Sequence, residues 1–283
     1  MEIKSLAKTD YETIAKACIQ AFADYEIQLN VEELKRMWKR RGFCPELSFA
    51  AFDGADIAAY TLNGIGMFNG VNMAYDTGTG TLPKYRGQGL ATKIFTSSIP
   101  FLKAANINHY LLEVLQHNTK AVSIYQKIGF EVTREFYYFM WKKQELSNVN
   151  KKVEIPCSIE RFEIEKHPYI SNFWDFYPSW QNSFEAIQRE PEDFVSLGAF
   201  TKGKLIGYCV FEPTSGDVTQ IAVNKEHRRK GVASLLLDQV GKLNKNEEMK
   251  LINSEISSVS IVALLRSKNV DISGKQFEMI KAI

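Results

Sequence analysis

The sequence predicts an α/β (α+β) protein made of two domains that share one plan. The length of 283 residues suits two domains of ordinary size. Helix-like and strand-like patterns alternate along the chain. The second half also repeats features of the first: residues 196–200 resemble residues 48–52, and Arg228 to Ala233 echo Arg86 to Ala91. A tandem duplication accounts for these observations together.

Composition excludes several classes of protein. The chain is 45% hydrophobic and 24% charged, as folded globular proteins are, and its formal net charge of +2 gives no general attraction for nucleic acid or membranes. No apolar run approaches the roughly 20 residues of a membrane span, and the N-terminus lacks a signal-peptide pattern. The four cysteines are far apart and the histidines share no spacing. We therefore expect a cytoplasmic protein with reduced cysteines and no metal site.

The first half begins with two helices followed by a hairpin. The expected helices cover Tyr11–Phe22 and Val31–Lys39, and the first strand begins at Ser48 and turns at Asp53-Gly54. The second half has the same hairpin, with its turn at Lys202-Gly203. A Gly-rich loop is expected over residues 63–70, which has no counterpart in the second half.

The rest of the first half alternates helix and strand. A helix follows residues 86–91 and runs toward Pro100, which is expected to kink or end it. The pattern then predicts a strand at His109–Leu115, a helix at Thr119–Ile128 and a strand at Val132–Trp141. Asn118 is the expected N-cap of that helix, and Gly129 is its left-handed stop.

The domain boundary is predicted at a polar stretch without periodicity. Residues 144–152 read as a linker. The expected domains are therefore 1–143 and 153–283.

One segment has the properties of a phosphate loop. Arg86-x-x-Gly89-x-Ala91 lies between a strand and a helix, where small residues let backbone N–H groups converge at a helix N-terminus. The sequence fits neither the Walker loop nor the dinucleotide fingerprint. The alternative interpretation is a turn whose glycines serve close packing.

The loop belongs to a longer ordered pattern. After it come a strand with Leu112-Glu113-Val114 and then Asn118, Ala121, Tyr125 and Gly129-Phe130. From Arg86 to Phe130 the chain resembles the GCN5-related N-acetyltransferases (GNAT), although Thr81-Leu82-Pro83 departs mildly from the usual V-x-P. The resemblance implies tandem domains, each with a mixed, mostly antiparallel sheet flanked by helices. It also implies acetyl-CoA as cosubstrate, held by the following residues: Thr81, Arg86, Gly87, Gln88, Gly89, Leu90, Ala91, Asn118 and Ala121.

Acetyl transfer to an amine needs a base and an acid. The amine must lose a proton, and the departing thiolate must gain one. The resemblance implies that Tyr125 is the acid, although its helical spacing with Ala121 and Ile128 also fits a plain core position. Glu113 is the first candidate for the base, Asp76 is the second, and a water molecule is the third.

The second half keeps the loop but lacks the phenol. Aligning the terminal helices places Ser258 opposite Asn118 and Leu265 opposite Tyr125. Ser258 is the expected cap at the start of the second helix, and Asn269 is expected past its end. The loop with Arg228, Gly231 and Ala233 retains the features of an anion site. We therefore expect an active first domain and a second domain that packs, regulates or shapes the acceptor cleft. Whether the second domain also binds coenzyme A stays open.

Two other functions are compatible with parts of the sequence. A non-catalytic acyl-CoA-binding or sensing protein is the main alternative. The basic run at residues 35–41 is the candidate for nucleic-acid binding, but a charge run on a helix is usually a solvated face. Asp24 and Glu26 are candidates to attract a cationic amine. The acceptor, a small-molecule or peptide amine, and the oligomeric state are not fixed by the sequence.

Overall fold

The computed structural model describes residues 1–24, 29–148 and 153–283. It divides into two compact units, each with a sheet and helices, as expected for an α/β (α+β) protein. The first unit contains Met1–Thr133, Ser183–Arg189 and Phe277–Ile283; the second contains Arg134–Asn182 and Glu190–Gln276. Among the described residues, none of the helices combines the length and the apolar character that crossing a membrane requires.

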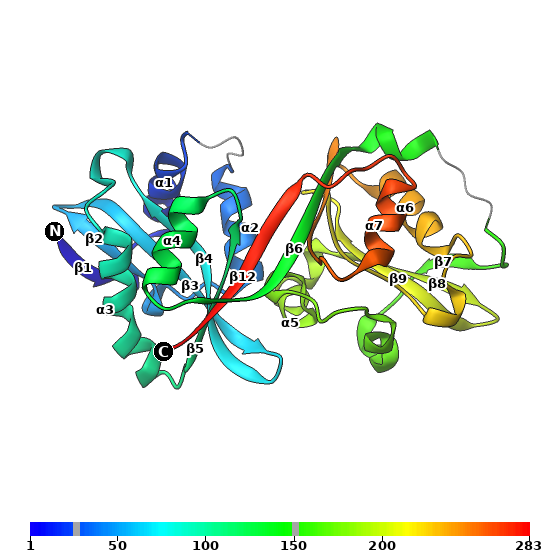
Figure 1. Cartoon of the computed structure of the whole chain (residues 1–283), viewed down its shortest axis with the longest axis horizontal. Coiled ribbons are helices and arrows are strands. Elements are labelled where there is room, and N and C mark those ends of the chain that lie inside the picture. Colours follow the sequence, from blue (N-terminus) through cyan, green and yellow to red (C-terminus); the bar gives the residue numbers. More distant parts are fainter. Residues whose placement is uncertain (25–28, 149–152) are drawn as a thin grey trace. The chain divides into compact units, whose positions relative to one another are not determined.

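The first unit is built on a mixed sheet whose strand order is β1-β2-β3-β4-β5-β12. Neighbours from β1 to β4 are antiparallel, and β4 and β5 are parallel (Figure 1). The strands are β1 (Glu2–Ser5), β2 (Phe49–Asp53), β3 (Asp56–Phe68), β4 (Val71–Thr81), β5 (His109–Leu115) and β12 (Gly274–Ala282). The helices are α1 (Tyr11–Ala21), α2 (Val31–Arg41), α3 (Leu90–Ala104), α4 (Thr119–Lys127) and α5 (Phe184–Arg189).

The strands of the second unit repeat this plan. Its strand order is β7-β8-β9-β10-β11-β6, and the parallel pair is β10 with β11. The strands are β6 (Glu131–Lys142), β7 (Ser158–Arg161), β8 (Val195–Thr201), β9 (Lys204–Glu212), β10 (Asp217–Val223) and β11 (Glu248–Glu255). The helices are α6 (Val232–Leu243) and α7 (Val259–Arg266) (Figure 1).

The two copies exchange their last strands. Strand β6 follows α4 of the first copy, yet from Arg134 onward it belongs to the second unit, where Phe139 and Trp141 are buried beside β11. Strand β12 follows α7 of the second copy, yet Phe277–Ile283 belongs to the first unit. The compact units therefore differ from the predicted domains at these two strands and at α5. A 3₁₀ helix, Lys143–Asn148, covers the first part of the predicted linker 144–152, and residues 149–152 lie outside the described residues.

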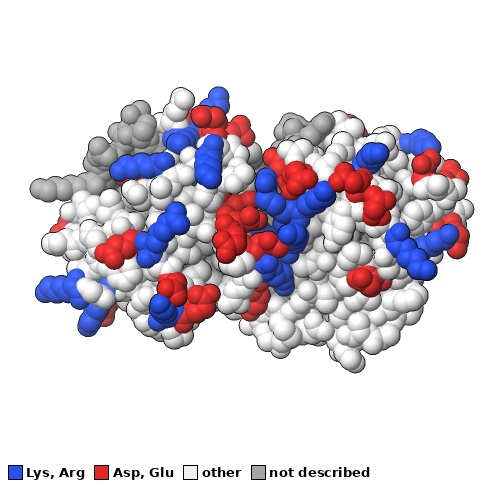
Figure 2. Space-filling view, turned by 180° about the vertical axis from the view of Figure 1, so that it is seen from behind, with Lys and Arg blue, Asp and Glu red and all other residues white. Residues whose placement is uncertain are grey.

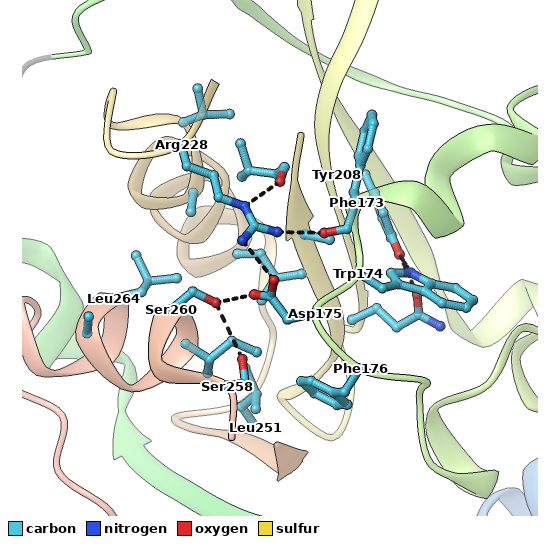
Figure 3. Close-up of a pocket in the computed structure, with 18 of the residues that line it drawn as sticks. Phe173, Trp174, Asp175, Phe176, Tyr208, Arg228, Leu251, Ser258, Ser260 and Leu264 are labelled. Atoms are coloured by element: carbon cyan, nitrogen blue, oxygen red, sulfur yellow. Dashed lines mark hydrogen bonds and ion pairs between the residues drawn. The ribbon is translucent and has the colours of Figure 1, made fainter. Parts of the chain in front are cut away.

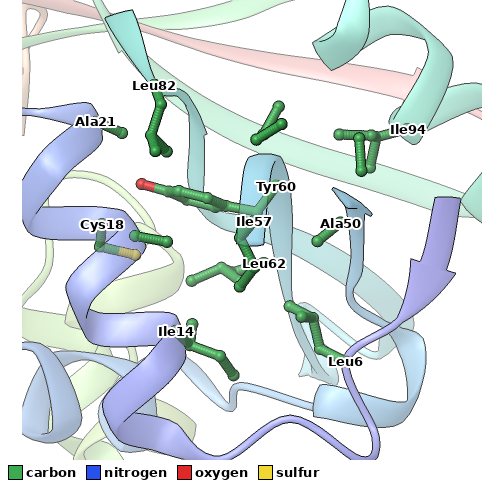
Figure 4. Packing of buried hydrophobic residues seen from close by; sticks show 14 of the residues in the cluster. Leu6, Ile14, Cys18, Ala21, Ala50, Ile57, Tyr60, Leu62, Leu82 and Ile94 are labelled. Carbon is green, nitrogen blue, oxygen red and sulfur yellow. The ribbon is translucent and has the colours of Figure 1, made fainter. Parts of the chain in front are cut away.

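The core of the first unit is centred on Tyr60 of β3. Its side chain is buried and its hydroxyl end points toward α1, where Cys18 and Ala21 lie, and Leu82 is also beside the ring (Figure 4). Burial of so many aliphatic and aromatic groups between α1 and the sheet is the main favourable free-energy term for this unit.

Most predicted helix ends in the first unit are confirmed by cap geometry. The Asn118 carboxamide accepts a hydrogen bond from the N–H of Ala121 at 3.2 Å, and Gly129 has a φ of +93°. The prediction that Pro100 could end its helix is wrong, because α3 continues to Ala104. Leu102, beyond the proline, is fully buried, and its packing favours continuation of the helix.

The prediction of a Gly-rich loop over residues 63–70 is wrong for most of these residues. Residues 63–68 continue β3, and the hairpin with β4 turns at Asn69-Gly70. Gly64 is required there because a Cβ atom would lie 2.1 Å from the carbonyl oxygen of Arg41. The glycine thus permits the end of α2 to approach the sheet backbone.

The basic run of α2 forms contacts within its own unit. Lys35 pairs with Glu12 at 2.8 Å and with Glu32 at 3.3 Å. Arg41 donates from Nη1 to the carbonyl oxygen of Thr77 at 3.1 Å, while Trp38 is buried. On the face of the molecule seen in Figure 2, Lys and Arg side chains are interspersed with Asp and Glu. This run therefore has an intramolecular explanation.

Candidate functional site

The candidate phosphate loop follows β4 and leads into α3. Gly87 and Gly89 have φ values of +79° and +71°, and Gly89 is the N-cap residue of the helix. A Cβ atom at either position would meet nothing within 4 Å, so the outer side of the loop is open. Because the first N–H groups of a helix have no partner within it, this loop and helix start can offer backbone donors to an anion.

The side chain of Arg86 anchors the loop. Its guanidinium donates to Asp24 at 2.6 and 2.9 Å and to the carbonyl oxygen of Ala21 at 2.9 Å. Its Nε donates to the carbonyl oxygen of Thr81, the last residue of β4, at 3.3 Å. The hydrogen bonds from Arg86 lower the pKa of Asp24 to about 2. Asp24 therefore has a partner in the loop itself, and Glu26 lies outside the described residues.

Tyr125 lies on an accessible helix. None of the residues of α4 is fully buried, and Ile124 beside Tyr125 is 40% exposed. The Tyr125 ring contacts the edge of Phe130 and packs against a core cluster that includes Ala74 and Leu112. Its hydroxyl donates a hydrogen bond to Asp76 at 3.1 Å. The phenol is thus half-buried with a polar partner, which differs from a plain core position.

Asp76 accepts two further hydrogen bonds. Thr79 donates from Oγ1 at 2.9 Å, and the N–H of Gly78 donates at 2.9 Å. Burial raises the pKa of Asp76 above its usual value, although these hydrogen bonds and the charge of Arg41 act in the opposite direction. A small cavity of about 10 Å³ is lined by Asp76, Tyr125 and Ala91, which joins this pair to the first turn of α3.

Glu113 lies apart from that pair. It accepts a hydrogen bond from the Tyr75 hydroxyl at 3.2 Å, and the Arg41 guanidinium lies 5.9 Å from the centre of the Tyr75 ring. The pKa of Tyr75 is raised well above its usual value. Burial is the larger cause, and the negative charge of Glu113 is the second. The two candidate bases therefore have different surroundings: Glu113 is near α2, and Asp76 is near α4.

The second unit contains a much larger cavity, which no motif in the sequence predicts. Its volume is about 670 Å³, and it lies between the start of α6 and α7. Aromatic side chains line it, among them Phe173, Trp174 and Phe176 (Figure 3). The aromatic-rich run at residues 173–180 was the available signal, but it has no clear match in the first half.

Arg228 anchors the second loop as Arg86 anchors the first. It donates to Asp175 at 2.8 Å, to the carbonyl oxygen of Phe173 at 2.8 Å and to that of Val223 at 3.0 Å. Asp175 also accepts from Ser260 of α7 at 2.5 Å (Figure 3). Burial acts to raise the pKa of Asp175, but the hydrogen bonds from Ser260 and Arg228 outweigh it and the pKa is lowered.

The second loop keeps the backbone shape of the first. Gly231 has a φ of +86° at the N-cap of α6, and Arg229 has a φ of +66° where the first loop has Gly87. A left-handed conformation costs a non-glycine residue about 1 kcal/mol or more. The second loop therefore keeps the backbone shape of the first, although arginine at position 229 disfavours the left-handed conformation. Ser258 occupies the N-cap position of α7, but its side chain makes no capping hydrogen bond, contrary to our expectation.

The residues with acid–base chemistry are replaced in the second unit. Leu265, opposite Tyr125, is fully buried. The matching β-bulges of β4 and β10 place Val218 opposite Asp76. Counting back from the helix caps places Asn253 opposite Glu113. The second unit thus combines an open cavity with side chains that cannot transfer protons at these positions.

Comparisons with known proteins agree with this architecture. The sequence profile of the Acetyltransferase (GNAT) family matches residues 13–130 and 159–255. N-alpha-acetyltransferase 30 of Schizosaccharomyces pombe is 28% identical over 96 residues, which are 34% of this chain and 64% of that protein. The match thus spans slightly under two thirds of the length of this curated relative.

Two solved structures cover nearly the whole chain. A GCN5-related N-acetyltransferase from Sphaerobacter thermophilus has a TM-score of 0.72 at 16% identity, covering 99% of this chain and 95% of that one. A tandem GNAT protein from the clavulanic acid biosynthesis pathway also has a TM-score of 0.72, at 12% identity, covering 99% and 98%. At these identities the likeness concerns the fold.

Proposed function

The chain belongs to the acetyltransferase (GNAT) family, and from this premise we propose that it is an N-acetyltransferase. In this proposal it moves the acetyl group of acetyl-CoA to a primary amine of a small molecule or a peptide. The chemistry is assigned to the first unit, in which Tyr125, Asp76 and Glu113 are all present.

The first unit has residues that fit the phosphates of acetyl-CoA. The open backbone at Gly87, Gln88 and Gly89 and the first N–H groups of α3, from Leu90 and Ala91, are suited to an anion. Asn118 and Ala121 begin α4, and Thr81 ends β4. Arg86 contributes by fixing the loop through Asp24. Acetyl-CoA, when bound, supplies the acetyl group as a thioester.

The proposed proton transfers use residues of the first unit. Glu113 accepts the proton that the acceptor ammonium must lose, directly or through a water molecule. Tyr125 donates its phenolic proton to the departing thiolate. One observation carries the assignment. Tyr125 lies on the accessible helix α4, yet its half-buried hydroxyl has a carboxylate partner, Asp76 of β4, at 3.1 Å.

The test is acetyl transfer to a defined set of amines. The purified chain is incubated with acetyl-CoA and, separately, with amino acids, polyamines, aminoglycosides and peptides with free amino groups. We expect amine-dependent release of the coenzyme A thiol, together with an acetylated product in the mass spectrum, for at least one class. Thiol release that no amine accelerates would contradict the proposal.

A second function is favoured by the cavity of the second unit. We propose that this unit binds a coenzyme A thioester without transferring its acyl group. The loop with Arg228, Gly231 and Ala233 retains the anion-site geometry beside a cavity of about 670 Å³. Leu265 and Val218 replace the residues that would move protons. Binding without turnover suits a regulatory or supporting unit.

Calorimetric titration with coenzyme A distinguishes the two units. Ala91 and Ala233 occupy equivalent positions in the first turns of α3 and α6, and each lines the cavity of its own unit. We expect two sites in the wild type, with one lost in Ala91→Trp and the other in Ala233→Trp, because an indole in the first turn of the helix obstructs the approach of the phosphates to its N-terminal N–H groups. A stoichiometry that Ala233→Trp leaves unchanged would contradict binding in the second unit.

A further inference from the structure

The two candidate carboxylates lie on opposite faces of the sheet of the first unit. Side chains alternate along a strand, so Asp76 shares the face of Ala74, which packs in the cluster with Phe95 of α3. Glu113 follows Leu112, a member of that same cluster, and so points to the other face. Its partner Tyr75 lies on that face too, under Arg41 of α2. Asp76 and Glu113 therefore lie on opposite faces, just beyond Tyr75 and Leu111, the last paired residues of β4 and β5. A thioester held between these two strands would have one of the carboxylates on each side.

We propose that Asp76 is the positioning residue for Tyr125, and that Glu113 acts independently of both; this proposal rests on the acetyltransferase function proposed above. The Asp76 carboxylate accepts the phenolic hydrogen and holds the hydroxyl in one orientation. Thr79 and Gly78 fix the carboxylate in turn, at 2.9 Å each. The carboxylate thereby sets the direction of the Tyr125 O–H bond before the thiolate forms.

The second unit lacks both groups of this pair, and Asn253 there replaces Glu113 as well. Where the first unit has Asp76 and Tyr125, the second has Val218 and Leu265, both fully buried. The carboxylate and the phenol are therefore absent together at equivalent positions. An apolar residue in place of Asp76 would remove the carboxylate to which the Tyr125 hydroxyl donates at 3.1 Å. Asp76 and Tyr125 thus behave as one unit of the site.

The division of roles predicts which kinetic effects multiply. With the best amine from the acceptor screen, we expect Asp76→Asn to lower kcat at least about tenfold, with KM for acetyl-CoA changed less than about twofold. Adding Tyr125→Phe to Asp76→Asn is expected to cost little more than Tyr125→Phe alone. Adding Glu113→Gln to Asp76→Asn is expected to multiply the two losses. Multiplication in the first pair, or its absence in the second, would overturn the proposal.

A second measurement needs no acceptor. Tyrosine labelled with ¹³C at Cζ is observed by NMR during a pH titration, and Tyr125 is assigned with Tyr125→Phe. We expect the Tyr125 resonance to titrate at a pH at least about one unit lower in Asp76→Asn than in the wild type, because a nearby negative charge is removed. Thr79→Val, which keeps that charge, is the matched control, with a smaller expected change. Equal midpoints in wild type and Asp76→Asn would overturn the positioning role even if no amine were acetylated.

Discussion

Replacing Tyr125 by phenylalanine is expected to lower kcat for acetyl transfer about 100-fold or more, since general acid catalysis contributes at least that much. The variant loses the hydroxyl that donates to Asp76 at 3.1 Å but keeps the ring that packs against Phe130. KM for acetyl-CoA should therefore change little. Steady-state kinetics over a range of acetyl-CoA concentrations, at saturating amine, measures both quantities.

Tyr11→Phe is the matched control for this change. Tyr11 lies on α1 of the same unit, is 43% exposed, and packs its ring against Trp38 and Phe43. Its hydroxyl has no place in the proposed chemistry, so kcat should stay within about twofold of the wild type. Full activity in Tyr125→Phe would return Tyr125 to a packing role.

Replacing Gly64 by alanine is expected to destabilise the first unit by about 3 kcal/mol or more. The added Cβ would lie 2.1 Å from the carbonyl oxygen of Arg41, and this is backbone at the end of α2. A side chain could rotate away, whereas the helix end must shift as a whole. Arg41 would move with it, away from Tyr75 and Thr77 beside Glu113. Denaturant unfolding measures the stability change.

Gly78→Ala is the control for stability. Gly78 lies in β4 of the same hairpin, where an added Cβ would make ordinary contact with Leu62 at 4.0 Å. We expect a change within about 1 kcal/mol, because no backbone atom has to move. Similar losses in the two variants would mean that α2 does not constrain Gly64.

Local sequence signals predicted most of the first unit. The strand His109–Leu115 has the predicted bounds, and Asn118 and Gly129 mark the ends of α4 as expected. These features depend on side-chain alternation and on cap chemistry within a few residues. Pro100 was misjudged because the burial of Leu102 outweighs the local cost of the proline, and that burial depends on tertiary contacts.

The candidate site was predicted as a set of residues but not as an arrangement. The sequence identified Tyr125, Glu113 and Asp76 as candidates. It did not show that the two carboxylates have different surroundings, so both remained candidates for the general base. Their separation depends on how β4 and β5 alternate within one sheet, which needs the register of both strands. The binding roles of the loop residues, Thr81 and Asn118 stay predictions. The cavity of the second unit is formed by segments far apart in the chain, so no local pattern encoded it.

The exchange of final strands has a consequence for synthesis. The sheet of the first unit includes Phe277–Ile283, which the ribosome adds after the whole of the second unit. Ile283 donates to the carbonyl oxygen of Asn108 at 3.0 Å, next to the start of β5. One edge of β5 therefore has no partner strand while the second copy is translated. An unpaired strand edge can form hydrogen bonds with the wrong strand or with another chain. The unit that starts to fold first is completed after its neighbour, and a chain truncated after the first copy would keep that edge open.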